Sequence, residues 1–307
     1  MADMYGETLM ELHEKIEEKR KRGGRSDFGG VIRAEEAEGY CRAKGIGMDE
    51  FMLLLVPIAQ GYALTPISDF AVGAVVLGES GNLYLGANAE FRGPGLNASV
   101  HAEQAAVNAA LVSGYEETGL TALAVSAAPC GHCRQYLNEI EGAGGLRVLI
   151  QQASSGLVVR TSLRELLPLA FGPGDLRMSE SLLRRGDNKL VMRDEGLDEV
   201  VWAALMAANW GYAPYTRSYA GVALQVEDGR IFVGVLSENA AYNPSLSPMQ
   251  SAVSHMRMWN EGFAGIRRAV LVEVEGAICS QVVNTSGVLG VVAPGVELEV
   301  YGARVGL

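Results

Sequence analysis

Hydrophobic positions along the first half of the chain follow the periods of helices and strands in turn. Residues 50 to 63 are apolar on most faces of a helix, which predicts a buried helix. The apolar runs 70 to 77 and 83 to 87 are joined by Gly-Glu-Ser-Gly-Asn, which predicts a β-hairpin. Residues 120 to 127 form a run of the length of a buried strand. Near the beginning, residues 7 to 22 fit an amphipathic helix.

Two further segments are rich in helix formers and begin with residues that can bind metals. One runs from His101 to Val112 as His-Ala-Glu-Gln-Ala-Ala-Val-Asn-Ala-Ala-Leu-Val. The other follows Pro129, a residue that suits the entry to a helix, and contains Cys130 and Cys133. The histidine and both cysteines are therefore expected at helix N-termini. The exposed N–H groups and the positive end of the helix dipole there favour thiolates.

The second half of the chain repeats the first. Pro66-Ile-Ser-Asp-Phe-Ala-Val-Gly-Ala aligns with Pro214-Tyr-Thr-Arg-Ser-Tyr-Ala-Gly-Val. The register continues without a gap as far as Gly86 and Gly234. The sequence therefore predicts an internal duplication.

The second copy lacks the polar residues that carry chemistry in the first. After a short insertion, Asn88-Ala-Glu-Phe is expected to align with Asn239-Ala-Ala-Tyr, and His101-Ala-Glu-Gln aligns with Ser247-Pro-Met-Gln. Cys279 stands alone, so the second copy has no cysteine pair. Three further positions differ: Glu90 against Ala241, His101 against Ser247, and Glu103 against Met249. The second copy is therefore expected to be structural, packing against the first or covering its site.

His101, Cys130 and Cys133 together predict a zinc site. Three protein ligands leave the fourth tetrahedral position open, which is typical of catalytic zinc. Glu103 lies two residues beyond the histidine, and a carboxylate that is not a ligand can carry a proton from water to a substrate nitrogen. His-x-Glu followed by Pro-Cys-x-x-Cys is the signature of zinc deaminases. The pattern predicts one catalytic zinc ion per chain in a deaminase that acts on an amidine.

A Cys-x-x-Cys pair has other interpretations. It could be a redox pair or half of a structural zinc site, and His132 inside it could be an alternative ligand. The chain has only four cysteines, so no second pair completes a four-thiolate site. Neither alternative accounts for the upstream His-x-Glu.

Asn88 and Glu90 follow the predicted strand 83 to 87 and precede the helix that begins at His101. Polar residues at a strand end are often ordinary loop residues. Beside a catalytic helix, however, an amide and a carboxylate can bind the hydroxyl groups of a substrate. They are therefore candidate substrate-binding residues.

Charge and composition favour a small substrate. The formal net charge is −11, which disfavours nucleic acid because phosphate contacts need a basic surface. The basic residues between 19 and 25 follow an acidic stretch and are interpreted as a solvated helix end rather than a targeting segment. The longest apolar run, 51 to 59, is far shorter than the roughly 20 residues of a membrane-spanning helix. With four cysteines and no signal-peptide pattern in residues 1 to 18, a cytoplasmic protein is expected.

The order of these motifs resembles that of cytidine deaminases of the long-chain, homodimeric type found in enteric bacteria and plants. The resemblance lies in Asn88-x-Glu90, His101-Ala-Glu103 and Pro129-Cys-Gly-x-Cys-Arg-Gln, followed by a degenerate repeat. Ala-Phe-Gly-Pro-x-Asp-Leu between the copies is also similar to that family. The resemblance implies zinc-dependent hydrolysis of cytidine or deoxycytidine to the uridine product with release of ammonia, a reaction of pyrimidine salvage. It also implies an α/β fold, a duplicated α/β/α sandwich around a mixed sheet, in a homodimer.

The resemblance also implies roles for particular residues. Asn88 and Glu90 would hold the ribose 3′-hydroxyl, and Phe70 would pack on the pyrimidine. Glu103 would hydrogen-bond N3 and the C4 amino group while it moves protons. Since dimers of that family place part of the partner chain near the pocket, Phe171 is a candidate contact from the segment between the copies.

The chain is expected to contain an N-terminal helical segment, a catalytic domain, a linker and a degenerate domain, at residues 1–47, 48–162, 163–188 and 189–307. A deaminase of nucleotides or of polynucleotide cytosine would share the zinc motif. Glu90 beside the sugar and the acidic chain would repel a phosphate, which favours a nucleoside. A binding module without activity would predict damaged motifs in the first copy, and these motifs are intact.

Overall fold

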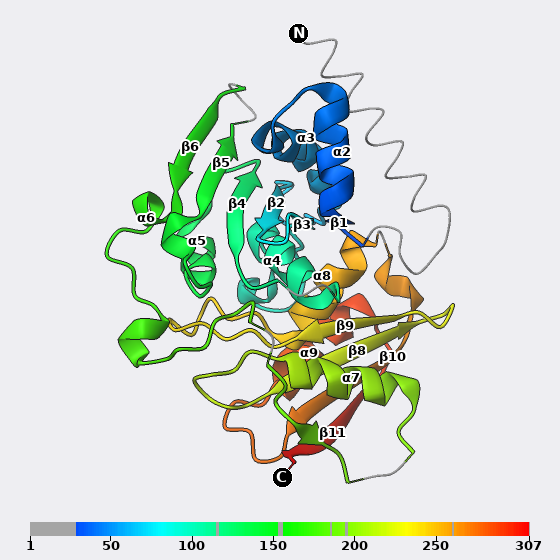
Figure 1. Ribbon diagram of the computed structural model, residues 1–307. Helices are drawn as coiled ribbons and strands as arrows, with labels where there is room; N and C mark the ends of the chain where they lie inside the picture. Colours follow the sequence, from blue (N-terminus) through cyan, green and yellow to red (C-terminus); the bar gives the residue numbers. More distant parts are fainter. Residues whose placement is uncertain are drawn as a thin grey trace.

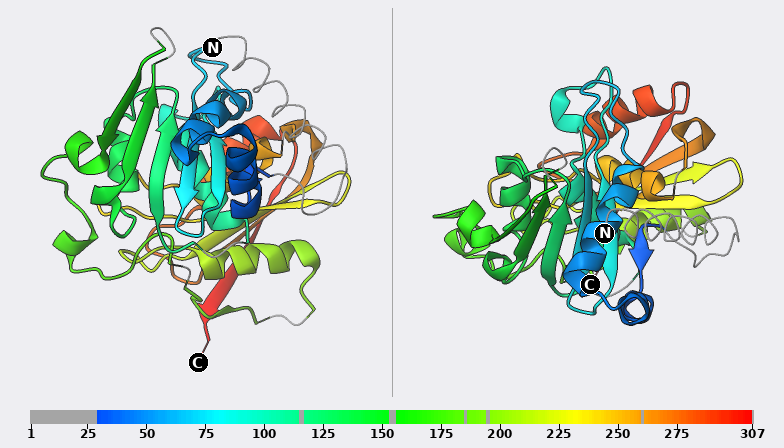
Figure 2. Two further views of the ribbon diagram at one scale, coloured as in Figure 1. Left: turned by 45° about the horizontal axis from the view of Figure 1, so that its top comes forward. Right: turned by 90° about the horizontal axis from the view of Figure 1, so that it is seen from above.

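The computed structural model describes residues 29–114, 117–152, 156–184, 186–193, 196–259 and 261–306. The helix expected at residues 7–22 and the basic cluster at 19–25 lie outside the described residues. Each half of the chain folds around its own β-sheet, and Figure 1 shows the first repeat above the second. Figure 2 shows the second repeat, yellow-green to red, packed along one side of the first.

The sheet of the first repeat has six strands in the order β1-β3-β2-β4-β5-β6. Only β4 and β5 pair in parallel, so the sheet is mixed, as expected. The predicted hairpin is confirmed, because β2 and β3 pair antiparallel around the expected turn. The strands are β1 (Val31–Ile32), β2 (Gly73–Gly78), β3 (Leu83–Ala87), β4 (Leu120–Val125), β5 (Arg147–Gln151) and β6 (Val158–Ser162).

Helices cover both faces of this sheet (Figure 1). The predicted buried helix is α3 (Met48–Gln60), which packs with α2 (Ala34–Lys44) on one face. On the other face lie α4 (Ala102–Val112) and α5 (Gly131–Leu137), the two helices expected to begin at metal-binding residues. Short helical turns occupy the connections: η1 (Leu96–Ala98), η2 (Ala143–Gly145), α6 (Leu163–Leu166) and η3 (Pro173–Leu176).

The second sheet has five strands in the order β7-β11-β10-β8-β9. Here β10 and β11 are the parallel pair, and α7 (Glu199–Trp210), α8 (Pro248–Met258) and α9 (Val282–Val292) pack around the sheet. The turn η4 (Phe263–Gly265) precedes β10. The strands are β7 (Leu190–Val191), β8 (Ala220–Val226), β9 (Ile231–Val235), β10 (Ile266–Val274) and β11 (Leu298–Val305).

Matching glycines show that the two sheets are repeats of one design. A Cβ atom on Gly86 would lie 2.1 Å from the backbone nitrogen of Ala106 in α4, and one on Gly234 would lie 2.1 Å from the backbone oxygen of Pro248 in α8. Only glycine lets helix and strand approach so closely at these two aligned positions. The duplicated α/β/α sandwich around a mixed sheet is therefore confirmed.

One part of the predicted repeat alignment is wrong. In the first repeat, the Glu90 N–H donates to the Leu64 carbonyl at 2.8 Å. In the second, the Glu238 N–H donates to the Tyr212 carbonyl, also at 2.8 Å. Glu90 therefore corresponds to Glu238 and not to Ala241, and no insertion follows the glycines. The length difference lies further on, because 11 positions separate Glu90 from His101 but nine separate Glu238 from Ser247.

The two repeats share one hydrophobic core, which runs from the first sheet through α4 and α8 to the second sheet. Polar contacts cross it in both directions. Gln104 Nε2 in α4 donates to the Pro244 carbonyl at 3.2 Å, and Gln250 Nε2 in α8 donates to the Ser99 carbonyl at 3.0 Å. No helix among the described residues is both long enough and apolar enough to cross a membrane.

Candidate active site

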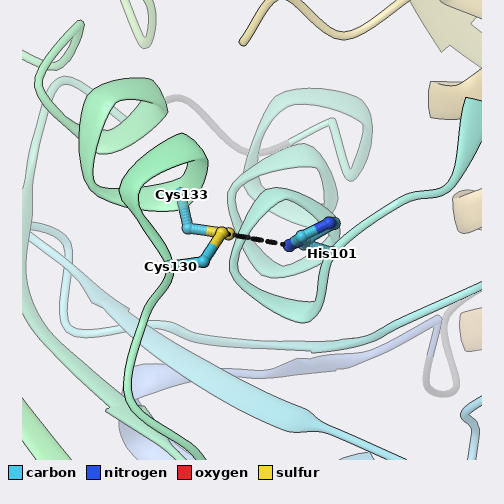
Figure 3. A group of neighbouring side chains, drawn as sticks. All are labelled: His101, Cys130 and Cys133. Atoms are coloured by element: carbon cyan, nitrogen blue, oxygen red, sulfur yellow. Dashed lines mark hydrogen bonds between the residues drawn. The ribbon is translucent and has the colours of Figure 1, made fainter. Parts of the chain in front are cut away.

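His101 lies directly before α4, as its N-cap residue. Its backbone N–H donates to the Gln104 side chain at 3.3 Å, so this helix begins with its N-terminal residue held in place. The imidazole is left to project from the start of the helix toward α5 (Figure 3).

Cys130 and Cys133 are brought together by the start of α5. Cys130 is the N-cap residue and is exposed, whereas Cys133, three residues later, is buried in the first turn. A spacing of three residues places both sulfur atoms on one side of a helix. Figure 3 shows both thiols pointing toward His101.

These three side chains fit a zinc ion. His101 Nδ1 lies 3.5 Å from Cys130 Sγ and 3.2 Å from Cys133 Sγ, and the two sulfur atoms are 3.6 Å apart. With bonds of about 2.3 Å to sulfur and about 2.0 Å to nitrogen, tetrahedral zinc holds its donors about 3.5–3.8 Å apart. Among the residues that the structure describes, this is the one group of three such side chains that could hold a metal ion. The set accounts for one zinc per chain and leaves a fourth position open.

The environment of the thiols favours one thiolate even without a metal. The hydrogen bond from Cys133, helped by the N–H groups of Cys133 and His132 and opposed by burial, lowers the pKa of Cys130 to about 4. The same hydrogen bond and burial raise the pKa of Cys133. His132 does not join the donor set; its ring stacks on that of His101 at 5.3 Å between centroids.

Glu103 lies in the first turn of α4 and is only 4% exposed. It is not one of the metal-binding group, although the Cys133 thiol is within hydrogen-bonding reach of it. Burial raises the pKa of this carboxyl group. A buried carboxylic acid whose pKa moves toward neutrality suits a group that both accepts and donates protons.

A cavity of about 320 Å³ connects the predicted site residues. Six of them line it: Phe70, Asn88, Glu90, His101, Glu103 and Cys130. The rest of its lining consists of Ser68, Val72, Ser99, Val100, Ala102, Ala127 and Ala128. No lysine or arginine is among these described lining residues. The cavity therefore has the size of a small-molecule site and offers no cation for a phosphate.

Glu90 receives hydrogen bonds from the loop before β2. Its Oε2 accepts from the N–H groups of Ile67 (3.0 Å) and Ser68 (2.9 Å), and its Oε1 accepts from the Ser68 hydroxyl. Burial opposes ionisation, but these hydrogen bonds prevail and lower the pKa of Glu90. An ionised carboxylate has about four acceptor positions, so one remains for a ligand hydroxyl.

Asn88 holds the same loop. Its Nδ2 donates to the Phe70 carbonyl at 2.9 Å, and its Oδ1 accepts from the Val72 N–H at 2.8 Å. Phe70 is 59% exposed at the mouth of the cavity, where an aromatic face is available to a ring. Asn88 and Glu90 therefore shape the cavity wall in addition to lining it.

Phe171 is not among the residues that line the cavity. Its backbone carbonyl accepts from Gln135 Nε2 at 2.8 Å and from Asn138 Nδ2 at 3.0 Å, while the residue is 45% exposed. The single chain thus places Phe171 beside α5 but outside the site of its own chain.

The sequence interpretation missed Ser68 and Ser99, which also line the cavity. Ser68 could have been found, because Pro-Ile-Ser-Asp precedes a predicted strand and a serine there is suited to a turn. Ser99 has no comparable local signal, since it joins the site only through the loop that leads to His101.

Comparison with known families matches both repeats to one description. Residues 48–144 and residues 163–286 each match a cytidine and deoxycytidylate deaminase zinc-binding region. Both matches begin before the first strand of the hairpin of their repeat.

Relatives match nearly the whole chain. A cytidine deaminase of Shewanella loihica is 40% identical over 97% of this chain and 98% of its own length, and one of Photobacterium profundum is 41% identical over 83% of each. A solved cytidine deaminase of Burkholderia pseudomallei is 32% identical over 40% of this chain and 98% of its own, with a TM-score of 0.36. With two matching regions and relatives of this similarity and coverage, the chain belongs to the cytidine deaminase family.

Proposed function

We propose that this chain catalyses the zinc-dependent hydrolysis of cytidine and deoxycytidine to uridine and deoxyuridine, with release of ammonia. The observation that carries the proposal is a group of three zinc donors, two of which line one cavity together with a buried carboxylate outside the donor set. The names of the relatives point to cytidine as a substrate.

His101, Cys130 and Cys133 are proposed to hold the zinc ion. When bound, zinc supplies Lewis-acid activation of a water molecule at neutral pH. Glu103 would take a proton from the attacking water and deliver it to N3 of the pyrimidine. It would then take the second proton from the hydroxyl group added at C4 and deliver it to the amino group, so that the C4–N bond breaks and water and cytidine become uridine and ammonia.

Asn88 and Glu90 are proposed to bind the ribose 3′-hydroxyl, Glu90 through its remaining acceptor position and Asn88 through its second amide hydrogen. Phe70 would pack on the pyrimidine. The absence of lysine and arginine from the described cavity lining supports a nucleoside over a nucleotide or a nucleic acid.

A homodimer is part of the proposal. Phe171 is half exposed on the segment that packs beside α5, so it is available to a partner chain. We assign it as a contact near the partner's cavity, since it does not line that of its own chain.

The setting and the division of the chain complete the proposal. A cytoplasmic setting is supported by four free thiols among the described residues, since thiols stay reduced there, and the proposed reaction would serve pyrimidine salvage. Residues 1–47, 48–162, 163–188 and 189–307 are proposed as the N-terminal segment, catalytic domain, linker and degenerate domain. The described part of the linker contains α6 and η3.

The test is the loss of ultraviolet absorbance of cytidine, with and without a chelator. Cytidine and deoxycytidine should both be deaminated, the chelator should abolish turnover, and added zinc should restore it. Cytosine and deoxycytidylate should be poor substrates. Zinc-loaded protein that leaves cytidine unchanged would refute the proposal, and a preference for deoxycytidylate would make the chain a nucleotide deaminase.

A further inference from the structure

A buried carboxylate of the first repeat is held entirely by the second. Glu139 lies in the turn that ends α5 and is 1% exposed. Its Oε1 accepts from the Tyr212 hydroxyl at 2.8 Å and from the Tyr215 hydroxyl, and its Oε2 accepts from the Ala240 N–H at 2.9 Å. Burial raises the pKa of both tyrosines, and so do the charge of Glu139 and the hydrogen bonds to it. Each phenol therefore remains a donor at neutral pH.

A second set of contacts lies one turn earlier on the same helix. Asn239 is fully buried, and its Nδ2 donates to the Gln135 carbonyl at 2.9 Å. Gln135 Nε2 in turn reaches Asn239 Oδ1 at 3.4 Å. Both sets of contacts join α5 to the stretch 212–240 of the second repeat.

The phenols are particular to the second repeat. Tyr212 and Tyr215 occupy the positions of Leu64 and Ile67 in the first repeat, as the matching backbone hydrogen bonds to Glu238 and Glu90 show. Neither hydrocarbon side chain could donate to a carboxylate. The repeat without metal-binding residues therefore carries the donors that fix the end of α5.

Helix α5 is only seven residues long, yet it supplies two of the three proposed zinc donors. A short helix has little stability of its own, so its position depends on its tertiary contacts. We propose that Glu139, Tyr212, Tyr215 and Asn239 are positioning residues that hold α5, and with it Cys130 and Cys133, in the geometry that binds zinc. This inference rests on the proposed zinc ligands.

The test measures zinc release to a competing chelator from purified, zinc-loaded protein. Glu139→Gln replaces one carboxylate oxygen with an amide N–H group, which then faces the hydrogen-bond donors of Tyr212, Tyr215 and Ala240. The double variant Tyr212→Phe/Tyr215→Phe removes both phenol hydroxyl groups. Removal of groups that orient metal ligands weakens metal affinity by about 10- to 100-fold, so we expect zinc release to become at least about 10-fold faster. In cobalt-substituted protein the thiolate-to-metal absorption bands should shift as well.

The chain offers a matched control away from α5. Glu117 is also buried, 4% exposed, and accepts from the Tyr84 hydroxyl at 2.6 Å and the Ser80 N–H at 3.3 Å. Glu117→Gln and Tyr84→Phe should lower the melting temperature comparably while zinc release stays at the wild-type rate. The single variant Tyr215→Phe, which leaves two donors on Glu139, covers the case in which the stronger variants do not fold.

Equal zinc release from Glu139 and Glu117 variants of equal melting temperature would overturn the inference, as would unshifted cobalt bands. The proposed function has a separate point of failure. If wild-type protein bound no zinc or did not deaminate cytidine, the function would fail and this inference with it. If wild-type protein did both and the two sets of variants behaved alike, only the inference would fail.

Discussion

The two repeats have the same frame but differ at the end of the sheet where a site can form. In the first, the residue before α4 is His101 and the first turn carries Glu103; in the second, the residue before α8 is Ser247 and the first turn carries Met249. A cavity of about 430 Å³ also lies beside Ser247, lined by residues of the second repeat and by the loop 94–98 of the first. None of its described lining residues is an Asp, Glu, His, Lys, Arg or Cys. A cavity beside the start of the matching helix is therefore not enough for this chemistry, which also needs the metal donors and the carboxylate.

The carboxylate that both repeats retain has a structural role that does not depend on the metal donors. Glu238 accepts from the N–H groups of Tyr215 (3.0 Å) and Thr216 (3.2 Å), as Glu90 does from Ile67 and Ser68. A repeat without metal-binding residues has kept this interaction, so its first role is to hold the loop before the hairpin. Binding of a ribose hydroxyl by Glu90 would be added to that structural role.

The largest expected effect separates the residues that precede the two matching helices. His101→Ala should reduce zinc from one ion per chain to almost none and turnover to background, because one of three donors is lost. Ser247→Ala removes only a hydroxyl that accepts from the Gln250 N–H, at a cost of about 1 kcal/mol of stability. Metal analysis and cytidine turnover check both. Two zinc ions per wild-type chain would contradict the assignment.

The next test compares the first turns of these helices. Glu103→Gln should retain zinc but lower kcat by more than about 10⁴-fold, because one residue would serve several proton transfers. Met249→Leu, a substitution of similar volume at a buried position, should leave kcat unchanged. Zinc content and kcat are measured on the same preparations. Near-normal turnover in Glu103→Gln would exclude this carboxylate as the proton carrier.

The retained carboxylates allow a smaller and more selective test. Wild-type enzyme should prefer deoxycytidine to 2′,3′-dideoxycytidine by at least about 10²-fold in kcat/KM, because the second compound leaves Glu90 unpaired. Glu90→Ala should remove most of this preference, whereas Glu238→Ala should lower stability by about 1–3 kcal/mol and keep it. Equal loss of preference in both variants would mean that Glu90 acts only on the loop.

The smallest expected effect is a dependence of stability on pH that comes from a histidine of α8 with no histidine at the matching position of α4. His255 occupies the position of Ala109, and burial lowers its pKa to about 4. Below its ordinary pKa of about 6.5 the unfolded chain gains a proton that the folded chain does not bind. This contribution to stability is therefore present above pH 6.5 and is lost as the pH falls toward 4. Wild type should lose about 1 kcal/mol more than His255→Gln between pH 7 and 5.5 in urea unfolding.

The sequence predicted those features that depend on local pattern. Helix starts at His101 and Cys130, and the hairpin from Gly73 to Ala87, follow from residue type and period, and the structure has them there. The alignment of Asn88 with Asn239 was wrong because both are followed by alanine and, two residues after that, by an aromatic residue, a match of residue types that backbone pairing contradicts.

Long-range contacts were beyond local pattern. Glu139 and Tyr212 are 73 positions apart, and neither has a neighbour whose type suggests the pairing. The position of β7 could not be predicted either, because a strand of two residues carries almost no periodic signal. The predicted role of Phe171 depends on a second chain, which the sequence of one chain does not place.

The strand order of the second sheet bears on how the protein is made. All strands of the first sheet precede residue 163, so they are synthesised before any strand of the second sheet. In the second sheet β11, which follows the other four strands of that sheet in the sequence, lies in the interior between β10 and β7. Residues 190 and 191 of β7 therefore cannot form this pairing until residues 304 and 305 of β11 have been synthesised. The proposed zinc donors at positions 101, 130 and 133 are therefore synthesised well before the strand that completes the second sheet.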